Sequence, residues 1–467
     1  MNVFDLEGQP KMLTTVGATI DVQHPTPALI EYCEKNLVIP NPEYAKKKRM
    51  GFWTGNTAKT IQLYDIVGET YVIPYGCLYE VFPIIKQRGI ISAFRDIEKH
   101  DYGVDIDLYG YQENAVEIMK QYAVGILQSE AGSGKTRMGL AIIAGLQRRA
   151  LWITHTLDLV KQAHTDALEL GFKPSDLAEI KGGKVEISKG ITFATIQTLA
   201  NVNLGKYKNY WDIVIVDEVH RVASSGDSLT RYEKVLNQIS ARHKFGLSAT
   251  VHRADGLIKT TFALMGGVAH KVDKKDIADK IMSVKVRCIP TDFRLNERCI
   301  DTSGMINHAR LISELTKDEE RNKLIADLLK KDKRPTLVLS NRIEHLKHLR
   351  ELVGRGEIMA GRMSKKERER IIAETKSGKN KLLFATYQLC QEGLDIPRLE
   401  HLYYVTPIKD YAQVVQSIGR VARTHNGKQQ PMCFDIADTL VKYLAKNYRN
   451  RRSIYRKIGC EVIEDEC

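Results

Sequence analysis

The sequence lacks the features that mark a secreted, membrane-spanning or metal-stabilised protein. Its eight cysteines are scattered over 467 residues, with no CxxC pair and no clustered histidines beside them. Neither a disulfide framework nor a metal site is therefore predicted. No apolar run approaches the length of a membrane span, and the acidic N-terminal residues lack the basic start and apolar run of a signal peptide. We expect a reduced protein of the cytoplasm, or of the host-cell cytoplasm if the chain is viral, with no membrane partner.

Acidic residues are outnumbered by basic ones. The chain has 70 Lys and Arg against 57 Asp and Glu, which gives a net charge of +13. This surplus favours a polyanionic partner, although charge alone does not identify one. The length exceeds what a single hydrophobic core usually holds, so two or three domains are expected.

A glycine-rich loop of sequence SEAGSGKT, residues 129–136, organises the chain. It lies between an apolar strand, Val124–Leu127, and an apolar helix, Met138–Leu146, which is the context of a phosphate-binding loop. The helix presents its positive end to an anion. Ser129 stands where the first glycine of the pattern is usual. A glycine-rich turn that binds nothing explains neither the lysine–threonine pair nor this context.

The residues of this loop have distinct expected roles. Backbone N–H groups of the loop would point at phosphate oxygens, Lys135 would reach the terminal phosphates, and Thr136 would offer its hydroxyl to Mg²⁺. Gln112, just ahead of the amphipathic helix Glu113–Tyr122, could read the edge of an adenine with its amide. The loop residues expected to hold the nucleotide are Gly132, Ser133, Gly134, Lys135 and Thr136.

Two carboxylates follow the apolar run Trp211–Val216, at the point where a buried strand would end. We expect Asp217 to hold Mg²⁺ through its water shell and Glu218 to polarise the attacking water. The alternative, a capped helix start, is disfavoured by the loop upstream. Small polar residues behind these strands could relay the state of the γ-phosphate. The expected coupling residues are His220, Ser248 and Thr250.

Apolar strands alternate with helices from Asp107 onward, which predicts an α/β fold with parallel sheets. The alternation of strands and helices stops over residues 286–335 and restarts at Pro335. Residues 1–100 are interrupted by prolines and do not show this alternation. We therefore predict a small N-terminal α+β domain over residues 1–100, followed by two tandem parallel-sheet domains over residues 101–290 and 291–467.

Cations and aromatic residues adjoin each other in the N-terminal region. This combination suits phosphate contacts with some base stacking, whereas the alternative is a solvated loop with a core tryptophan. The residues expected to contact nucleic acid are Lys47, Lys48, Arg49 and Trp53.

The run QSIGRVAR in the second domain places Arg420 and Arg423 three residues apart, and hence on one face of a predicted helix. Arginines so placed can reach across a cleft to the γ-phosphate and stabilise the charge of the transition state. The alternative is a basic surface helix.

Taken in order, GSGKT, TIQTL, DEVH, SAT, ATYQLCQEGLDIP and QSIGRVAR resemble the motif series of superfamily 2 helicases and translocases. The resemblance covers roughly residues 108–440 and is strongest to the branch that contains XPB, UvsW and RadD-type proteins. It implies two RecA-like domains that close on ATP and step along one strand of nucleic acid. It also implies that Gly393 and Asp395 contact the nucleotide or couple it to the track. The residues that it places along the tracked strand are Thr154, Thr195, Gln197 and Thr386.

The function predicted from the sequence is an ATP-dependent DNA helicase or translocase that uses ATP and Mg²⁺. Its expected partner is DNA, as a single-stranded track within a forked or branched duplex, with unidentified recombination or replication proteins. The alternatives are an RNA helicase, a duplex DNA translocase that separates no strands, and a non-enzymatic nucleic-acid clamp. The intact set of catalytic candidates argues against the clamp.

Overall fold

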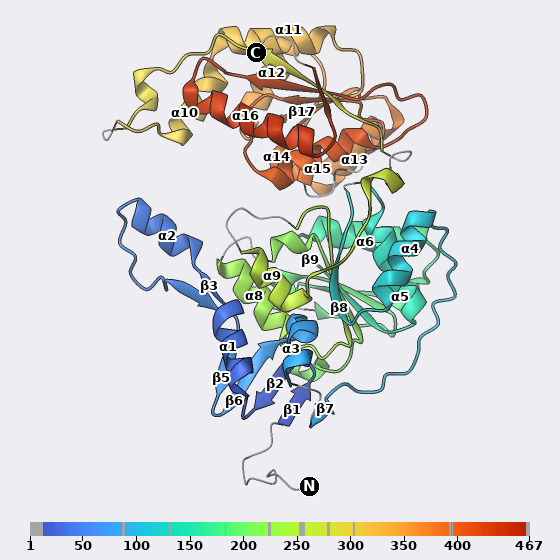
Figure 1. Ribbon diagram of the computed structural model, residues 1–467. Helices are drawn as coiled ribbons and strands as arrows, with labels where there is room; N and C mark the ends of the chain where they lie inside the picture. Colours follow the sequence, from blue (N-terminus) through green and yellow to red (C-terminus); the bar gives the residue numbers. More distant parts are fainter. Residues whose placement is uncertain are drawn as a thin grey trace. The chain divides into compact units, whose positions relative to one another are not determined.

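The computed structural model describes residues 13–85, 89–130, 132–182, 184–222, 226–251, 257–277, 281–301, 304–361, 363–391, 394 and 396–463. The chain forms two compact units (Figure 1). The first comprises residues 1–130 and 134–273, and the second comprises residues 131–133 and 274–467.

The first unit is built on a parallel sheet, whose described strands all pair in parallel except the antiparallel edge strand β11. In pairing order they are β11 (Lys184–Val185), β10 (Leu177–Lys181), β12 (Ile191–Thr195), β9 (Ala150–Thr154), β13 (Ile213–Asp217), β14 (His243–Ser248), β8 (Val124–Gln128) and β15 (Val268–Lys271). Strands β9, β12 and β13 are buried along their whole length, as apolar strands between two helical layers should be.

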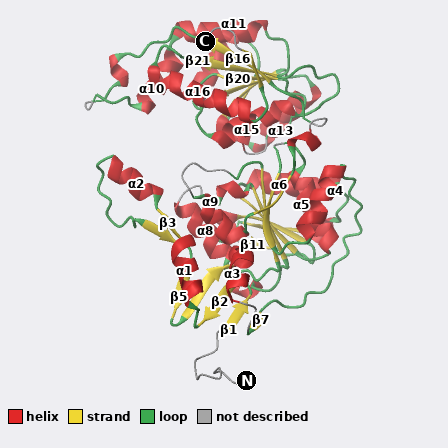
Figure 2. Cartoon of the chain, viewed as in Figure 1, coloured by secondary structure: helices red, strands yellow, loops and turns green. Residues whose placement is uncertain are grey.

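Helices cover both faces of this sheet, with α4, α5 and α6 on one side and α8 and α9 on the other (Figure 2). Their bounds are α4 (Gly110–Lys120), α5 (Lys135–Leu146), α6 (Leu157–Glu169), α7 (Ile196–Leu199), α8 (Gly226–Leu236) and α9 (Ile258–Met265). Strand β12 ends at Thr195, directly before α7. The Thr195 hydroxyl accepts a hydrogen bond from the Thr198 N–H at 3.2 Å and caps α7.

The N-terminal residues form a mixed five-stranded sheet with helices, which agrees with the predicted α+β texture. In pairing order the strands are β5 (Asp65–Val67), β6 (Thr70–Pro74), β2 (Thr19–Gln23), β1 (Leu13–Val16) and β7 (Ile90–Ser92). The helices and the separate strand pair are α1 (Pro27–Asn36), α2 (Pro42–Arg49), α3 (Leu78–Ile85), β3 (Val38–Pro40) and β4 (Thr60–Gln62).

The N-terminal sheet packs directly on the first α/β domain, through a buried lysine. The ammonium of Lys244, on β14, donates to the carbonyls of Ala18 at 2.9 Å and Leu236 at 2.8 Å, and it lies 5.2 Å from the centre of the Tyr75 ring. Burial lowers the pKa of Lys244 to about 7. At Gly76 the backbone lies so close to α9 that a Cβ added to this glycine would lie 2.4 Å from a backbone carbonyl oxygen of that helix. Residues before Asp107 are thus part of one compact unit with the domain that follows.

The second unit holds another parallel sheet, and every described strand pair in it is parallel. In pairing order the strands are β18 (Glu357–Met359), β19 (Leu382–Thr386), β17 (Thr336–Ser340), β20 (His401–Tyr404), β21 (Met432–Ala437), β16 (Lys285–Pro290) and β22 (Glu461–Ile463). The helices are α10 (His308–Lys317), α11 (Glu319–Lys331), α12 (Ile343–Val353), α13 (Lys365–Ser377), α14 (Tyr387–Gln391), α15 (Tyr411–Ala422) and α16 (Lys442–Lys457).

Alternate residues of β19 enter two different cores. Leu383 and Ala385 pack with residues of α13 to α16, whereas Leu382 and Phe384 pack with α11 and α12. Both faces of the sheet are therefore covered, as the near-continuous apolar run of this strand requires.

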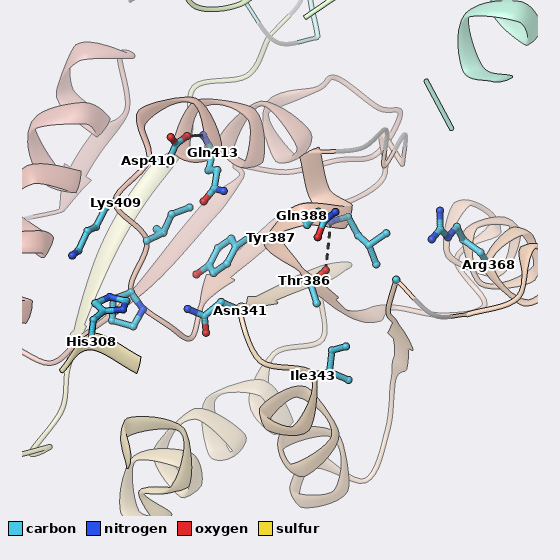
Figure 3. A pocket seen from close by; sticks show the side chains of 14 residues that line it. His308, Asn341, Ile343, Arg368, Thr386, Tyr387, Gln388, Lys409, Asp410 and Gln413 are labelled. Carbon is cyan, nitrogen blue, oxygen red and sulfur yellow. Dashed lines mark hydrogen bonds between the residues drawn. The ribbon is translucent and has the colours of Figure 1, made fainter. Parts of the chain in front are cut away.

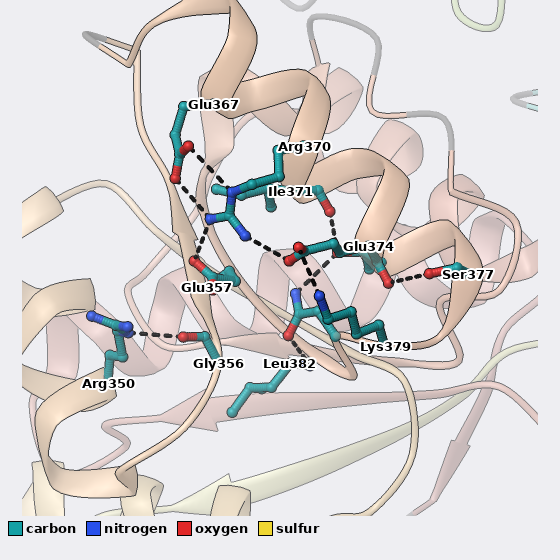
Figure 4. Close-up of polar contacts among 12 residues, drawn as sticks. Arg350, Gly356, Glu357, Glu367, Arg370, Ile371, Glu374, Ser377, Lys379 and Leu382 are labelled. Carbon is teal, nitrogen blue, oxygen red and sulfur yellow. Dashed lines mark hydrogen bonds and ion pairs between the residues drawn. The ribbon is translucent and has the colours of Figure 1, made fainter.

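One ion pair joins helix α13 to the edge strand β18, and it belongs to a network along the helix (Figure 4). Arg370 contacts Glu367 at 2.7 Å, Glu374 at 2.6 Å and Glu357 of β18 at 3.4 Å, and Lys379 adds a contact to Glu374 at 3.3 Å. These charges are exposed to solvent, so the network sets the orientation of the helix more than it adds stability.

Six described cysteines carry free thiols, whereas Cys288 is disulfide-bonded, so the expectation of a chain without disulfides fails at Cys288. Among the described helices, none combines the length and the apolar character that crossing a membrane requires.

Candidate nucleotide and nucleic-acid sites

The glycine-rich loop connects β8 to α5, as the sequence predicts. Gly134 precedes the first turn of α5 with φ at +81°, and Gly132 has φ at +88°, a region that favours glycine. Lys135 begins the helix, and its ammonium donates to the carbonyls of Ser129 at 3.3 Å and Glu130 at 3.2 Å. Thr136 lies beside it in the same turn. The loop therefore directs a lysine and the positive end of a 12-residue helix toward one point.

Gln112 is buried against this loop. The carboxamide oxygen accepts a hydrogen bond from the backbone N–H of Tyr109 at 3.0 Å, at the start of α4. The carboxamide nitrogen lies so near Gly134 that a Cβ on that glycine would come within 2.5 Å of it. The position beside the loop agrees with a role near the nucleotide, but the oxygen also has a local partner at the helix start.

Asp217 and Glu218 lie at the carboxyl end of β13, as predicted. Glu218 has φ at +51°, which is uncommon for a residue with a side chain and marks local backbone strain at the site. Burial and the charge of Glu218 raise the pKa of Asp217 to about 7. Burial also opposes ionisation of Glu218, but the contact with His220 and the charge of Lys135 outweigh it and lower the pKa of Glu218. Glu218 is thus held as a carboxylate, which a group that polarises water must be.

His220 connects these carboxylates to the next strand. Its Nδ1 lies 3.2 Å from the Glu218 carboxylate and 3.0 Å from the Ser248 hydroxyl at the end of β14. The Ser248 hydroxyl in turn donates to the Thr250 carbonyl at 2.6 Å and accepts from the Thr250 N–H at 3.1 Å. All three predicted coupling residues therefore belong to one chain of contacts that begins at Glu218.

The donor set fits a magnesium nucleotide. Lys135 is close enough to lower the pKa of both Asp217 and Glu218, so one cation, two carboxylates and a helix N-terminus converge at the ends of β8 and β13. An acid with a raised pKa next to a second carboxylate is stabilised in its ionised form by a divalent cation. Carboxylate oxygens are also ligands that Mg²⁺ prefers.

Two threonines predicted to face the tracked strand have local partners. Thr154 is buried and its hydroxyl donates to the Thr156 carbonyl at 2.8 Å, while the Thr195 hydroxyl lies 2.9 Å from that of Thr198. Gln197 is exposed, and its amide donates to the His155 carbonyl at 3.2 Å. These contacts favour a role for the two threonines in shaping the strand ends, which leaves Gln197 as the more accessible candidate.

The second unit contains a cavity of about 690 Å³ at the carboxyl ends of its strands (Figure 3). Thr386, the last residue of β19, lies in its wall beside Asn341, which follows β17, and Lys409, which lies beyond β20. Gln388 and Gln413 contribute amides to the same wall. In parallel sheets ligands bind at this edge of the strands, so the cavity is a candidate site for the track.

The charge of this cavity is suited to an anion. Arg368 projects from α13, and Lys409 lies 4.4 Å above the Tyr443 ring. Burial and nearby cations, Lys409 first, lower the pKa of His308. Asp410 is the carboxylate in the wall, and its side chain accepts from the Gln413 N–H at 2.8 Å at the start of α15.

Arg420 lies in the last turn of α15, where its guanidinium donates to the Cys390 carbonyl at 3.0 Å. Arg423 does not continue that helix, because its ψ of 139° is extended and it bridges to Ile281. Its φ of −62° is helical, so the extended ψ redirects only the chain after Arg423, and the common helical face of the two arginines stays a prediction. Gly393 and Asp395 lie outside the described residues.

Reasoning from the sequence missed the amides and cations of the cavity wall. The available signal was the rule that polar residues after parallel strands tend to be functional, since Asn341 directly follows β17 and Lys409 lies just past β20. Lys244 was also missed, because its partners are as far as 226 residues away in sequence.

Comparisons with known proteins agree with this architecture. Residues 105–253 match the family model described as "Type III restriction enzyme, res subunit", and residues 319–425 match "Helicase conserved C-terminal domain". The structure of Dbp5 from S. cerevisiae bound to RNA and ADP BeF3 matches with a TM-score of 0.54 at 15% identity, over 76% of this chain and 90% of that one. T4 UvsW matches over 97% of this chain and 99% of its own, at 18% identity and a TM-score of 0.42.

Curated relatives include helicases with different stated substrates. A putative ATP-dependent RNA helicase of Acanthamoeba polyphaga mimivirus is 25% identical over 74% of this chain and 66% of its own length. The DNA 3'-5' translocase XPB2 of Sulfurisphaera tokodaii is 24% identical over 68% and 79%. The DNA 3'-5' helicase XPB of Kineococcus radiotolerans is 23% identical over 71% and 60%. The matches thus span about two thirds of the relatives' own length.

The two parallel-sheet domains, the phosphate loop and the DEVH box define a superfamily 2 helicase with RecA-like domains, and the predicted fold class is confirmed. The XPB proteins of S. tokodaii and K. radiotolerans are 24% and 23% identical to this chain, which agrees with the resemblance to the XPB-containing branch that its motifs predict.

Proposed function

We propose that this chain is an ATP-dependent DNA helicase or translocase that unwinds or branch-migrates forked or junction DNA in replication, recombination or repair. The observation that carries the proposal is the convergence of Lys135, Asp217 and Glu218 at the strand ends of a domain followed by a helicase C-terminal domain. This set matches the needs of ATP hydrolysis and has no evident structural purpose.

In this mechanism Mg²⁺ bound with the nucleotide would neutralise phosphate charge. Lys135 and the N-terminus of α5 would hold the phosphates, and Thr136 and Asp217 would hold the cation. Glu218, kept ionised by His220 and Lys135, would orient and polarise the attacking water. A change at Glu218 would then pass through His220 to Ser248 and the residues that follow β14.

Four residues of the second domain complete the proposal. We assign Arg420 and Arg423 to stabilising the charge on the transferring phosphoryl group, and Gly393 and Asp395 to contacting the nucleotide or coupling it to the track. This assignment rests on their motifs. The proposed domains are an N-terminal one over residues 1–100 and two parallel-sheet domains. Because β16 (Lys285–Pro290) pairs in the second parallel sheet, the boundary between those two domains lies before residue 285 and not at residue 290.

The track would run along the polar wall around Thr386. A cavity with lysine, arginine and amide donors suits phosphate oxygens, and Gln197 offers a further accessible amide in the first domain. DNA is favoured over RNA because two XPB relatives are named as DNA enzymes. RNA is the second candidate, since a mimivirus relative is named as an RNA helicase.

The experiment that tests this proposal measures ATP hydrolysis with single-stranded DNA, duplex DNA, a four-way DNA junction and single-stranded RNA in parallel. Strong stimulation by the junction or by single-stranded DNA is the expected result. Preferential stimulation by RNA would replace the proposed substrate. Stimulation by plain duplex without strand separation would identify a duplex translocase, and an absence of hydrolysis with all four would refute the proposal.

A further inference from the structure

The N-terminal region carries an arm that lies outside its sheet. Strands β3 and β4 pair antiparallel, from Val38 opposite Gln62 to Pro40 opposite Thr60, and α2 lies at the far end of the arm (Figure 1). None of the eight residues of α2 is buried. The arm, residues 38–62, thus projects from the domain at α2, while its base joins the core through the buried Ile39 and the partly buried Val38 and Ile61.

Contacts within the arm hold it in a defined shape. Asn41 accepts from the Glu43 N–H at 3.0 Å and donates to the Ala58 carbonyl at 2.9 Å, which joins the start of α2 to the returning chain. Lys47 donates to the Thr57 hydroxyl at 2.7 Å and pairs with Glu43 at 3.0 Å. Lys47 therefore fastens the helix to the loop, and the nucleic-acid contact predicted for it stays a prediction.

The loop of the arm exposes a tryptophan. Trp53 is 86% exposed, the highest value among the large apolar side chains of the described residues, and Phe52 next to it is 60% exposed. A Cβ on Gly55 would lie 2.5 to 2.8 Å from carbon atoms of the indole, so one face of the ring rests on that glycine. Gly55 has φ at +45°, which also favours glycine. The backbone thus supports one face of the indole and leaves the rest of the side chain open to solvent.

Exposed cations lie on α2, the helix that directly precedes the loop of Trp53. Lys46, Lys48 and Arg49 are exposed on α2, and no carboxylate of the described residues pairs with them. Cations in the last turn of a helix stabilise that helix, which could account for the cations of α2. This effect does not explain why exposed aromatic residues follow them. A polyanion with accessible flat rings matches both features, because phosphates bind the cations and a base stacks on the indole.

We propose that the arm binds forked DNA, with Trp53 stacked on an unpaired base where the strands separate and with Lys46, Lys48 and Arg49 on the flanking phosphates. This inference rests on the proposed function and names the element that meets the branch point. Unpaired bases released from the duplex expose their faces at the branch, and an aromatic side chain can stack on such a face.

The test uses the full-length protein and a DNA fork with 2-aminopurine at the branch point. Loss of a stacked base costs roughly 1–3 kcal/mol, so Trp53→Ala should weaken fork binding roughly 5- to 160-fold and abolish the change in 2-aminopurine fluorescence on binding. Trp53→Phe keeps an aromatic ring and should retain most of both. Neither variant should alter binding to a blunt duplex without unpaired bases.

The cations are tested by the salt dependence of fork binding. The triple variant Lys46→Ala, Lys48→Ala, Arg49→Ala should reduce the steepness of log Kd against log salt by up to about 0.9 for each lost duplex-phosphate contact. The matched control is Lys323→Ala, Lys330→Ala, Lys331→Ala on α11, which removes the same net charge from exposed positions. Circular dichroism should show that all variants fold, because no side chain of α2 is buried.

Three results would overturn the inference. These are unchanged fork affinity and fluorescence in Trp53→Ala, an equal loss of salt dependence in the α11 control, or equal weakening of fork and blunt-duplex binding. If the arm variants bind forks normally but lose a protein partner, the arm is a protein-docking surface. The wild-type protein separates the two proposals: if it unwinds forks while the arm variants match it in every assay, only the arm proposal fails.

Discussion

Replacing Lys244 with methionine should flatten the pH dependence of stability in the first unit. In the folded wild type the pKa of Lys244 is about 7, whereas the ordinary value for a lysine is 10.5. Below pH 7 both states hold the proton. Between these two values the unfolded chain binds a proton that the folded chain does not, so stability rises with pH. From pH 6 to pH 9 this linkage amounts to roughly 2–3 kcal/mol, which Lys244→Met should remove.

Urea unfolding at pH 6 and pH 9, followed by tryptophan fluorescence, measures this effect. All three tryptophans of the chain belong to the first unit, and Trp152 and Trp211 are fully buried there. Other groups titrate in this range in both proteins, so the difference between wild type and variant isolates Lys244. The variant also leaves two carbonyls without a donor, but that cost does not change with pH. Parallel stability curves for the two proteins would refute the reasoning.

The residues proposed as catalytic give three further predictions. Lys135→Ala should abolish ATP hydrolysis while DNA binding is largely kept, because the proposal places the lysine on phosphates of the nucleotide; retained turnover, measured by phosphate release, would remove the loop from the site. Glu218→Gln should bind ATP but hydrolyse it more slowly by orders of magnitude, since an amide polarises water poorly, and normal turnover would show that the carboxylate roles are wrong. Arg420→Ala and Arg423→Ala should each lower turnover far more than nucleotide affinity, by up to roughly the 10³–10⁵ measured for arginine fingers in GTPases. A change in affinity alone would exclude both arginines from the reaction.

Local sequence patterns were sufficient to predict the sheets and the positions of Asp217 and Glu218 at the end of β13. Buried parallel strands need continuous apolar, β-branched runs, and the loop and the DEVH box must follow such strands to place their side chains at one edge. The positions of Lys135, Asp217 and Glu218 relative to β8 and β13 were predictable for this reason.

Contacts that depend on exact ends or distant partners could not be predicted. Whether α15 continues to Arg423 depends on a backbone pairing with Ile281, and nothing local in QSIGRVAR indicates it. Similarly, the sequence marks Lys47 as one of four successive cations, and only the folded arm distinguishes it through Thr57. The role of Lys244 follows from carbonyls supplied by distant segments.

Strand separation on a fluorescently labelled DNA fork, with ATP and Mg²⁺, tests the central claim most directly. We expect the wild-type protein to release the labelled strand, and Lys135→Ala and Glu218→Gln to release it far more slowly than the wild type. An RNA fork of the same sequence should be a poorer substrate. Release of the strand by Lys135→Ala at the wild-type rate, or the absence of release by a wild-type protein that hydrolyses ATP, would contradict the central claim.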